Sequence, residues 1–379
     1  MKKTRVKYLR MVTYALLAVV VVLDAAFLIV RDKDYSPMEN RNLQQFPTLS
    51  WRTVTSGRFE SQFDDYVADQ FPLRNAWIAV KSTADRLLGR TEANNIFLGK
   101  DGYLIQNFTE PDRTNYRETV MTLRDFAVRH ANLSMYVLVA PSALTVYADK
   151  LPLNAIHGNE SAYLDRLRAD LADTPYHFVD VRQALLAQKD EAQLYYRTDH
   201  HWTTPGAYAA YREFAAAAGL PGAAQAYRAV LLTDGFSGTL TAQSGFRMTE
   251  TDELYAYLPE GGVSHVVTYA GDTSRYSSVY WTENLDVRDK YTVFFNGNHP
   301  EVKIETGAKS QRVLLVLKDS YANCFVPFLI QDYKKIVMVD PRYFTGDLET
   351  EIATEGVTDV LFMYNANTLA VDTSLKSDL

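Results

Sequence analysis

Four short runs of apolar residues, each followed by polar or turn-forming residues, constrain the fold of this chain most strongly. They are Met135 to Ala140, Val313 to Leu317, Ile336 to Val339 and Val360 to Met363. Strands that are apolar on both faces are typical of a parallel sheet covered by helices on both sides. Strands that alternate with helices connect by right-handed crossovers. The sequence therefore predicts an α/β fold with a mainly parallel sheet flanked by helices.

Further elements follow from periodicity and turn residues. Helices are predicted over Arg58 to Leu88 with a break at Phe71-Pro72, from Asp112 to Ala127, over Ser161 to Leu171 and over Thr204 to Ala218. A hairpin joins Ile96 to Leu98 with Tyr103 to Ile105, and His177 to Val181 is a further strand. Residues 231–304 are punctuated by glycine and predict a β-rich insertion, with strand pieces at Val266 to Tyr269 and Tyr291 to Phe295.

The N-terminus predicts a membrane-spanning helix. The run from Met11 to Val30 is apolar except for Asp24, and about twenty apolar residues suffice to cross a bilayer. The basic residues ahead of it are Lys2, Lys3, Arg5, Lys7 and Arg10. Lys and Arg residues beside a membrane span stay on its cytoplasmic side, so we expect a cytoplasmic N-terminus and an extracytoplasmic remainder. A cleaved signal peptide and a buried soluble helix are the alternatives, although a signal peptide has a shorter apolar core.

Charge and cysteine content exclude some classes of protein. The net charge is −7, and the only cluster of positive charge lies in the first ten residues, so we expect no nucleic-acid partner. The single cysteine, Cys324, allows no intramolecular disulfide. We divide the chain into a cytoplasmic tip and anchor (1–34), an extended tether with a helical segment (35–94), and an α/β domain (95–379) that carries the insertion.

A carboxylate stands two residues before an imidazole at Asp199-His200-His201. In an extended segment this spacing places Asp199 and His201 on the same side, so that the carboxylate can orient the ring and leave its other nitrogen free to take a proton. The alternative is a structural role, in which Asp199 caps the helix that starts near Pro205. A metal site is a third interpretation, with His265 and His299 as distant ligands, but adjacent histidines point opposite ways, and we expect no metal.

Ser320 directly follows one apolar run and precedes a helical segment. A nucleophile in this position is presented at the sheet edge, where amides at the helix N-terminus can stabilise an oxyanion. A simple helix N-cap is the alternative. Ser142, after the strand that ends at Ala140, is a rival nucleophile, although Pro141 favours a loop there.

Polar and aromatic residues after the other strands complete the candidate site. The amides of Asn365 and Asn367 are candidate oxyanion donors, while ordinary turn chemistry is the alternative. Arg342, with Tyr343, follows another strand end, where ligands bind in such sheets. Trp202 and Tyr343 can offer flat faces to carbohydrate rings, although such aromatic residues are more often buried.

Five ordered motifs resemble the bacterial DHHW family. They are Thr198 to Thr203 (TDHHWT), Lys318 to Phe325 (KDSYANCF), Met38 to Arg41 (MENR) with Phe46-Pro47, Asp69 to Arg74 (DQFPLR), and Thr358 to Asn365 (TDVLFMYN). That family resembles a branch of the SGNH-hydrolase-like proteins that includes the periplasmic alginate O-acetyltransferases. The match covers nearly the whole chain after the predicted span.

The resemblance implies a triad of Ser320 as nucleophile, His201 as base and Asp199 as the residue that orients the base. Asn367, less securely Asn365, falls where the family has an oxyanion asparagine. The sequence departs from the pattern at Lys318, where a glycine is expected two residues before the serine. A long side chain there is expected to narrow the oxyanion pocket.

The function that follows is a membrane-anchored O-acetyltransferase for a cell-surface polysaccharide, with an acyl-serine intermediate and no cofactor. A membrane-bound acyltransferase that supplies acetyl groups is the expected protein partner. Two alternatives remain open at this point: an esterase or deacetylase with the same triad, and a catalytically silent polysaccharide-binding or assembly component.

Overall fold

The computed structural model describes all residues except 1, 37–40, 247, 249 and 379, so most of the MENR motif lies outside the described residues. The chain forms two compact units. Unit 1 comprises Met1–Arg90 with Gly245–Arg247, and unit 2 comprises Thr91–Ser244 with Met248–Leu379.

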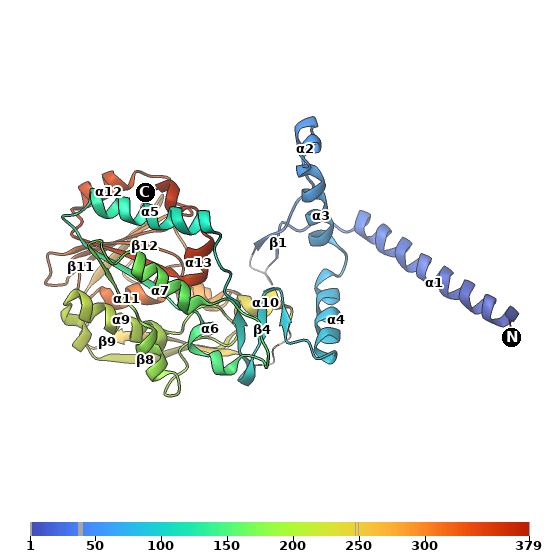
Figure 1. Cartoon of the computed structure of the whole chain (residues 1–379), viewed down its shortest axis with the longest axis horizontal. Helices are drawn as coiled ribbons and strands as arrows, with labels where there is room; N and C mark the ends of the chain where they lie inside the picture. The colour runs from blue at the N-terminus through green and yellow to red at the C-terminus, as the bar shows by residue number, and fades with distance from the viewer. Residues whose placement is uncertain (1, 37–40, 247, 249, 379) are drawn as a thin grey trace. The chain divides into compact units, whose positions relative to one another are not determined.

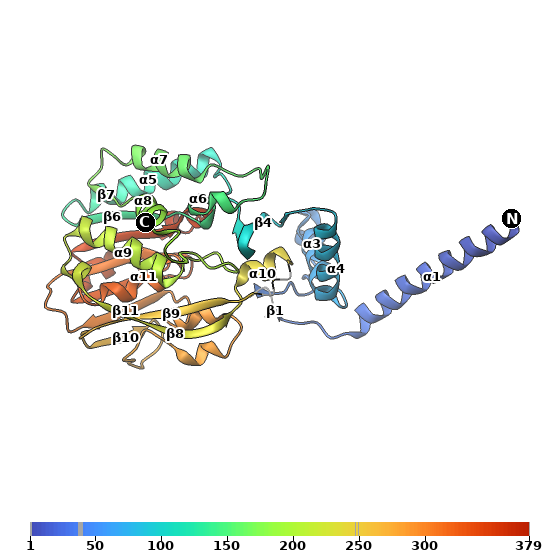
Figure 2. The ribbon, with the colours of Figure 1, turned by 90° about the horizontal axis from the view of Figure 1, so that it is seen from below.

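A seven-stranded sheet forms the centre of unit 2, in the order β10-β11-β13-β12-β14-β6-β7 (Figure 1 and Figure 2). Its strands are β6 (Ser134–Ala140), β7 (Tyr176–Phe178), β10 (His265–Tyr269), β11 (Glu301–Thr306), β12 (Val313–Lys318), β13 (Lys335–Val339) and β14 (Asp359–Asn365). The strands from β13 to β7 pair in parallel, and β10 and β11 join antiparallel at one edge. The predicted mainly parallel α/β sheet is confirmed.

Helices cover both faces of this sheet because its strands alternate apolar side chains to either side. Leu361 of β14 is in register with Tyr136 of β6, whose ring packs against Phe214 of α9 (Thr204–Ala218) at a centroid distance of 5.2 Å. The next residue, Phe362, packs on the opposite face against Phe126 of α5 (Arg113–Arg129), also at 5.2 Å. In Figure 1, α9 and α11 (Ala322–Leu329) lie on one side of the sheet and α5 lies on the other.

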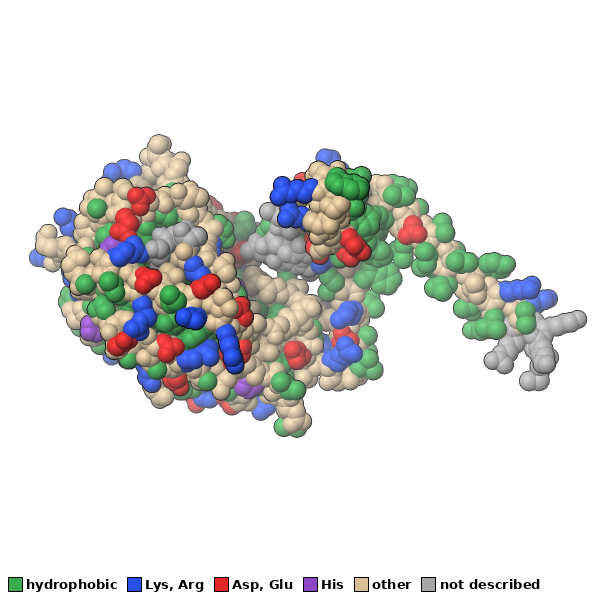
Figure 3. All heavy atoms as spheres, turned by 45° about the horizontal axis from the view of Figure 1, so that its top comes forward, with side chains coloured by type: hydrophobic (Ala, Val, Ile, Leu, Met, Phe, Trp, Pro, Cys, Tyr) green, Lys and Arg blue, Asp and Glu red, His purple; other side chains and the backbone are tan. Residues whose placement is uncertain are grey.

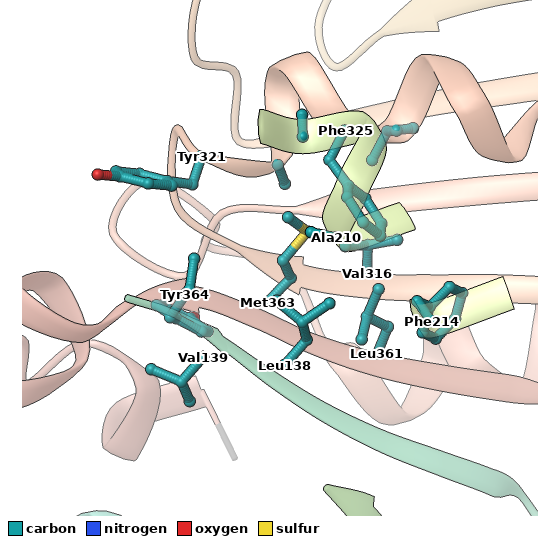
Figure 4. Close-up of a cluster of buried hydrophobic side chains, with 14 of the residues drawn as sticks. Leu138, Val139, Ala210, Phe214, Val316, Tyr321, Phe325, Leu361, Met363 and Tyr364 are labelled. Atoms are coloured by element: carbon teal, nitrogen blue, oxygen red, sulfur yellow. The ribbon is translucent and has the colours of Figure 1, made fainter. Parts of the chain in front are cut away.

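The core beneath α9 and α11 is closely packed and apolar. In Figure 4, Leu138, Leu361 and Met363 of the sheet point toward Phe214 of α9 and Phe325 of α11. All five side chains are fully buried. The strand ends that carry the candidate residues are therefore fixed by the buried apolar core of unit 2.

The remaining elements of unit 2 surround this sheet. The helices are α6 (Ala143–Val146), α7 (Glu160–Asp170), α8 (Arg182–Gln188), α10 (Thr239–Ser244), α12 (Leu348–Glu355), α13 (Ala366–Val371) and α14 (Leu375–Asp378). A small sheet contains β3 (Glu92–Ala93), β4 (Ile96–Leu98) and β5 (Leu104–Gln106), and a hairpin pairs β8 (Tyr227–Phe236) with β9 (Asp252–Pro259). The predicted hairpin at 96–105 and the predicted helix at 204–218 are confirmed.

The β-rich insertion contributes β10 and β11 to one edge of the main sheet, and it differs from its prediction in one segment. The segment Tyr291 to Phe295, predicted as a strand, is mostly a 3₁₀ turn over Lys290–Val293. Phe295 and Asn296 then adopt φ angles of 58° and 57°, a left-handed conformation that lies outside the extended region of regular strands.

Unit 1 consists of helices with one short pair of strands. They are α1 (Lys2–Ile29), β1 (Tyr35–Ser36), β2 (Arg41–Asn42), α2 (Trp51–Thr55), α3 (Arg58–Gln70) and α4 (Arg74–Leu87). The predicted break at Phe71-Pro72 separates α3 from α4, because proline restricts the residue before it. In α1, residues Val6–Ile29 form a helix long and apolar enough to cross a membrane, and hydrophobic side chains line it in Figure 3.

Candidate active site

Ser320 lies in the turn between β12 and α11, partly exposed at the carboxyl edge of the parallel strands. The carboxylate of Asp319 fixes this turn: it accepts the amide of Tyr321 at 2.9 Å and the amide of Asn365, from the end of β14, at 2.8 Å. Burial raises the pKa of Asp319, and these two amides lower it in part. The turn is therefore tied to two neighbouring strands of the sheet.

Asp199 and His201 lie in a loop closed by an antiparallel bridge between Tyr195 and Trp202. A second carboxylate anchors the loop from β9. Asp252, which is fully buried, accepts the amides of Arg197 and Thr198, both at 2.9 Å. The Thr198 hydroxyl also donates to it, at 2.6 Å. Side-chain anchors thus hold this loop in place of a continuous strand.

The structure brings the three predicted residues into one hydrogen-bonded chain. His201 Nδ1 lies 2.6 Å from Asp199 Oδ1, and His201 Nε2 lies 2.7 Å from Ser320 Oγ. Asp199 Oδ1 also accepts the backbone amide of His201 at 3.0 Å. With Nδ1–H donating to the carboxylate, Nε2 is left as an acceptor for the serine hydroxyl, which is the tautomer that a general base requires.

The second oxygen of Asp199 is held by residues that no sequence motif singles out. Asp199 Oδ2 accepts the amide of Thr239 at 2.8 Å and its hydroxyl at 3.0 Å. The preceding Gly238 lies so close that a Cβ atom there would stand 2.2 Å from the Asp199 Cβ. Glycine is therefore required at 238 because only a residue without a side chain permits this approach.

Burial and neighbouring charge act in opposite directions on the site. Burial raises the pKa of Asp199, but His200, His201 and the hydrogen bond from His201 outweigh it, so the pKa lies well below its usual range. For His200, burial and the nearby His201 lower the pKa to about 4. Asp199 is thus an anion and His200 is neutral at pH 7, which leaves His201 as the ring that this carboxylate orients.

Tyr291, from the insertion, is a site residue that sequence reasoning missed. Its ring stacks on the His201 imidazole, with centroids 3.8 Å apart and planes inclined by 10°. Its hydroxyl donates to the backbone carbonyl of Ser320 at 3.2 Å. The only signal in the sequence was an aromatic residue in a segment that resembled a strand.

The two candidate oxyanion asparagines differ in their surroundings. Asn365 caps α13: its Oδ1 accepts the amide of Asn367 at 3.0 Å, and its Nδ2 donates to the carbonyl of Ala140 at 3.2 Å. Asn367 is partly exposed, and its Oδ1 accepts the amide of Thr109 at 3.4 Å. Among the described residues its Nδ2 makes no hydrogen bond, so Asn367 is the asparagine with a free donor.

Trp202 does not present a face to a ligand. It is fully buried, stacks on Phe325 and donates from Nε1 to the carbonyl of Tyr321 at 3.1 Å. The prediction that Trp202 contacts carbohydrate is therefore wrong, because its faces pack in the core and its Nε1 is hydrogen-bonded.

Tyr343 is 51% exposed, with the Arg342 guanidinium 5.4 Å from its ring centroid. Arg342 donates through Nε and Nη2 to the buried Asp340, at 2.8 and 2.6 Å.

Lys318 does not fill the space beside Ser320. Its side chain is 1% exposed, and its ammonium group donates to Asn323 at 2.9 Å and to Asn298 at 3.2 Å, with Asp340 at 3.6 Å. Burial lowers its pKa to about 8, and Asp340 opposes that shift. The expected narrowing of the oxyanion pocket is therefore not what the structure shows, because Asn298, Asn323 and Asp340 bind the amine in a buried polar cluster.

The contacts support a metal site, or Ser142 as the nucleophile, less well than they support the triad. Among the residues that the structure describes, Asp199, His200 and His201 form a group whose candidate metal-ligand atoms lie within 4.8 Å of one another. Both ring nitrogens of His201 already have partners, Asp199 and Ser320, an arrangement that suits proton transfer better than ligation. Ser142 is 5% exposed and its hydroxyl accepts the amide of Leu144 as the cap of α6, so it is not presented as a nucleophile.

The sheet order, with the serine after β12 and the acid–histidine loop beside it, defines an SGNH-hydrolase-like fold. Residues 96–249 match the SGNH hydrolase-like domain of the acetyltransferase AlgX. A curated relative from Pseudomonas syringae pv. tomato, named "Probable alginate O-acetylase AlgJ", is 23% identical over 184 residues. That match spans 47% of this chain and 47% of the relative, so the chain spans about half the length of the curated relative.

Solved structures agree with this fold. A DHHW family protein from Eubacterium siraeum superimposes with a TM-score of 0.65 at 26% identity, covering 76% of this chain and 97% of that chain. Bacillus cereus PatB1 with a sulfonyl adduct superimposes with a TM-score of 0.64 at 22% identity, covering 75% and 99%. The predicted resemblance to the DHHW family and to the SGNH-hydrolase-like O-acetyltransferases is confirmed.

Proposed function

We propose that this chain is a membrane-anchored O-acetyltransferase that modifies a hydroxyl group of a cell-surface polysaccharide through an acyl-serine intermediate. The observation that carries the proposal is the hydrogen-bonded chain from Asp199 through His201 to Ser320, at 2.6 and 2.7 Å. Similarity to a protein named as an alginate O-acetylase supports acetyl transfer to a polysaccharide. The α1 helix supports an anchor, and the basic residues before it favour a cytoplasmic N-terminus.

The proposed reaction has two steps at one serine. Ser320 Oγ attacks the carbonyl carbon of an acetyl ester or thioester donor, and the hydroxyl proton passes to His201 Nε2. The bond to the donor's leaving group breaks, and that group departs with the proton. A polysaccharide hydroxyl then attacks the acetyl-serine and gives its proton to Nε2. The bond between Oγ and the acetyl carbon breaks, and Oγ takes the proton back.

Charge in each tetrahedral intermediate requires hydrogen-bond donors aimed at the oxyanion. In this proposal the backbone amide of Ser320 is one donor, and the amide of Asn367 is the other. The free Nδ2 of Asn367 supports this choice over Asn365, whose Nδ2 is bonded to the carbonyl of Ala140. Asp199, kept ionised by its surroundings, stabilises the imidazolium that forms at His201 in both steps.

The donor reaches the site from the membrane in this proposal. An anchored domain stays close to an acyl carrier in or at the bilayer, so a membrane-bound acyltransferase is the partner that we propose. Arg342 and the exposed ring of Tyr343 are the residues that we assign to polysaccharide binding. Arg342 keeps a guanidinium edge available beyond the two nitrogens that bind Asp340.

Acylation of Ser320 tests the proposal directly. Incubation of the full chain with p-nitrophenyl acetate is expected to release a burst of nitrophenol and to add one acetyl group, located at Ser320 by peptide mass spectrometry. Ser320→Ala is expected to lose both the burst and the adduct, whereas Ser142→Ala, a change at the rival serine, retains them. An unchanged burst in Ser320→Ala contradicts the proposal.

The same experiment separates transfer from hydrolysis. If an acetylatable oligosaccharide acceptor accelerates turnover and becomes acetylated, the chain is a transferase. If acetate release does not respond to the acceptor, the chain is an esterase with the same triad. A catalytically silent binding component would show no serine labelling by a phosphonate probe; the position of Lys318, held away by Asn298 and Asn323, removes the main argument for that alternative.

A further inference from the structure

The outer end of α1 carries an aromatic cluster that the proposed chemistry does not use. Phe27, in the last turns of α1, lies 5.7 Å from Tyr66 of α3, measured between ring centroids. Phe46 lies 5.4 Å from Tyr66 and 6.1 Å from Phe63. Phe59 stacks on Phe63 at 6.1 Å. We call Phe27, Phe46, Phe59, Phe63 and Tyr66 the aromatic cluster of unit 1.

The segment that leaves α1 is fixed to α3, although the sequence predicted an extended tether. The Tyr66 hydroxyl donates to the carboxylate of Asp32 at 3.1 Å. Gln70 accepts the amide of Lys33 at 3.0 Å and donates to its carbonyl, also at 3.0 Å. Asp69 accepts the amide of Gln44 at 2.9 Å, which ties the chain after β2 to the same helix. These bonds hold α3 beside the end of α1.

This attachment sets the depth of the cluster relative to α1. Phe27 stands two residues before Ile29, the last residue of α1, which is about 3 Å along a helix axis. If Val6–Ile29 crosses the bilayer, Phe27 lies at its outer boundary. Tyr66, in contact with Phe27, lies at the same level, with its ring against an apolar side chain and its hydroxyl on the acidic residue outside the span.

The cluster and the segment that follows it expose large apolar side chains. Phe46 is 59% exposed and Phe63 37%. Leu49, just before α2, and Trp51, its first residue, are 69% and 84% exposed. Exposed apolar surface of this kind is unfavourable in water, whereas aromatic rings with a polar tip are favoured at the level of lipid headgroups.

We propose that this surface of unit 1, formed by the exposed members of the aromatic cluster with Leu49 and Trp51, rests in the headgroup region of the bilayer that α1 crosses. Its partner is the lipid surface. Unit 1 is then an interfacial collar that is fixed to the span by the hydrogen bonds of Asp32 and Lys33 to α3. The inference depends on the proposed span and not on the serine chemistry.

Site-specific labelling of the full chain tests the inference. Burial raises the pKa of the native thiol Cys324 to about 12, so an added exposed cysteine can be labelled selectively with the environment-sensitive fluorophore NBD. Phe46→Cys and Trp51→Cys place the label on the proposed surface. Leu153→Cys, at a residue of unit 2 that is 92% exposed, is the matched control.

The labelled chains are reconstituted into phosphatidylcholine vesicles that contain lipids with nitroxide near the headgroup. We expect quenching of the labels at 46 and 51 to exceed that at 153 at least threefold, with a blue-shifted emission. Equal quenching at all three positions, in chains that float with the vesicles, overturns the inference. Failure of the chains to float overturns the span and the inference with it.

Two further readouts distinguish lipid contact from dimerisation and from the serine chemistry. If a second copy of the chain covers this surface, the labels at 46 and 51 are shielded from iodide equally in detergent and in vesicles, and that result overturns the lipid assignment. Hydrolysis of p-nitrophenyl acetate by the same labelled proteins reports separately on the proposed active site. Membrane contact by unit 1 without hydrolysis, or hydrolysis without membrane contact, can therefore be told apart.

Discussion

The two halves of the candidate site are built in different ways. The Ser320 turn is an extension of β12, a fully buried strand in the middle of the sheet, and its neighbour Asp319 bonds to the turn and to β14. The loop that carries Asp199 and His201 is closed by a single bridge and anchored by Asp252. Backbone pairing sets the position of the nucleophile, whereas buried side-chain hydrogen bonds set the position of the base.

This difference predicts where the site is vulnerable. Strand pairing spreads its stabilisation over many residues, so single substitutions near Ser320 are expected to leave its position intact. The loop depends on a few buried carboxylate bonds, and loss of one leaves polar groups unsatisfied, at a cost of about 1–3 kcal/mol each. Substitutions around Asp199 are therefore expected to reduce activity far more than comparable ones around the turn.

Asp199→Asn is the largest expected effect. The amide keeps the shape of the carboxylate but removes its charge and favours the wrong His201 tautomer, so kcat is expected to fall by about 10³–10⁴-fold. Steady-state hydrolysis of p-nitrophenyl acetate measures it. His200→Gln is the matched control, because His200 is neutral and is not bonded to Ser320, and it should lose less than tenfold. Similar losses in both variants would contradict the assignment of the base.

Gly238→Ala tests the anchoring of the loop itself. A Cβ at 238 would stand 2.2 Å from the Asp199 Cβ, so the loop must shift, and we expect kcat to fall by about 10–100-fold and stability by about 1–3 kcal/mol. Gly235→Ala is the control, since the nearest atom to its Cβ would be 3.7 Å away. Normal activity in Gly238→Ala would mean that the position of Asp199 is less restricted than the contacts imply.

The same contrast explains which parts the sequence could predict. Strands β12, β13 and β14 were recognisable because a buried parallel strand is a continuous apolar run. The triad residues were recognisable because Asp199 and His201 form an Asp-x-His motif and Ser320 stands just after a strand. Gly238, Thr239 and Asp252 carry no local signal, since their importance arises only when the β8–β9 hairpin and α10 pack against the loop that carries Asp199. Tyr291 was missed because its segment alternates like a strand, whereas stacking on His201 and two left-handed residues after it override that pattern.

Lys318, the last residue of β12, tests the half of the site that carries Ser320, through the pH dependence of the free energy of unfolding. Its pKa is lowered to about 8 by burial from a usual 10.5, so between these pH values the unfolded chain binds a proton that the folded chain does not. Stability contributed by this group therefore rises with pH across that window. We expect the free energy of unfolding of the native chain, relative to Lys318→Met, to rise by about 1–3 kcal/mol from pH 7 to pH 11. Urea unfolding in detergent at each pH measures it, and a flat difference would contradict the buried position of the amine.

Tyr291 joins the two halves, and its substitution is the mildest expected change. Tyr291→Phe keeps the ring on His201 but removes the hydroxyl that donates to the Ser320 carbonyl, so kcat is expected to fall only about two- to fivefold, equivalent to loss of one hydrogen bond of about 0.5–1 kcal/mol. Tyr291→Leu also removes the stacked ring, and we expect it to change the pH profile of kcat/KM, because the environment of the imidazole changes with the ring. A residue that only fills the core would lower stability in Tyr291→Leu and leave that profile in place. A shifted profile in Tyr291→Leu with an unshifted one in Tyr291→Phe would assign the ring to the base and the hydroxyl to the nucleophile.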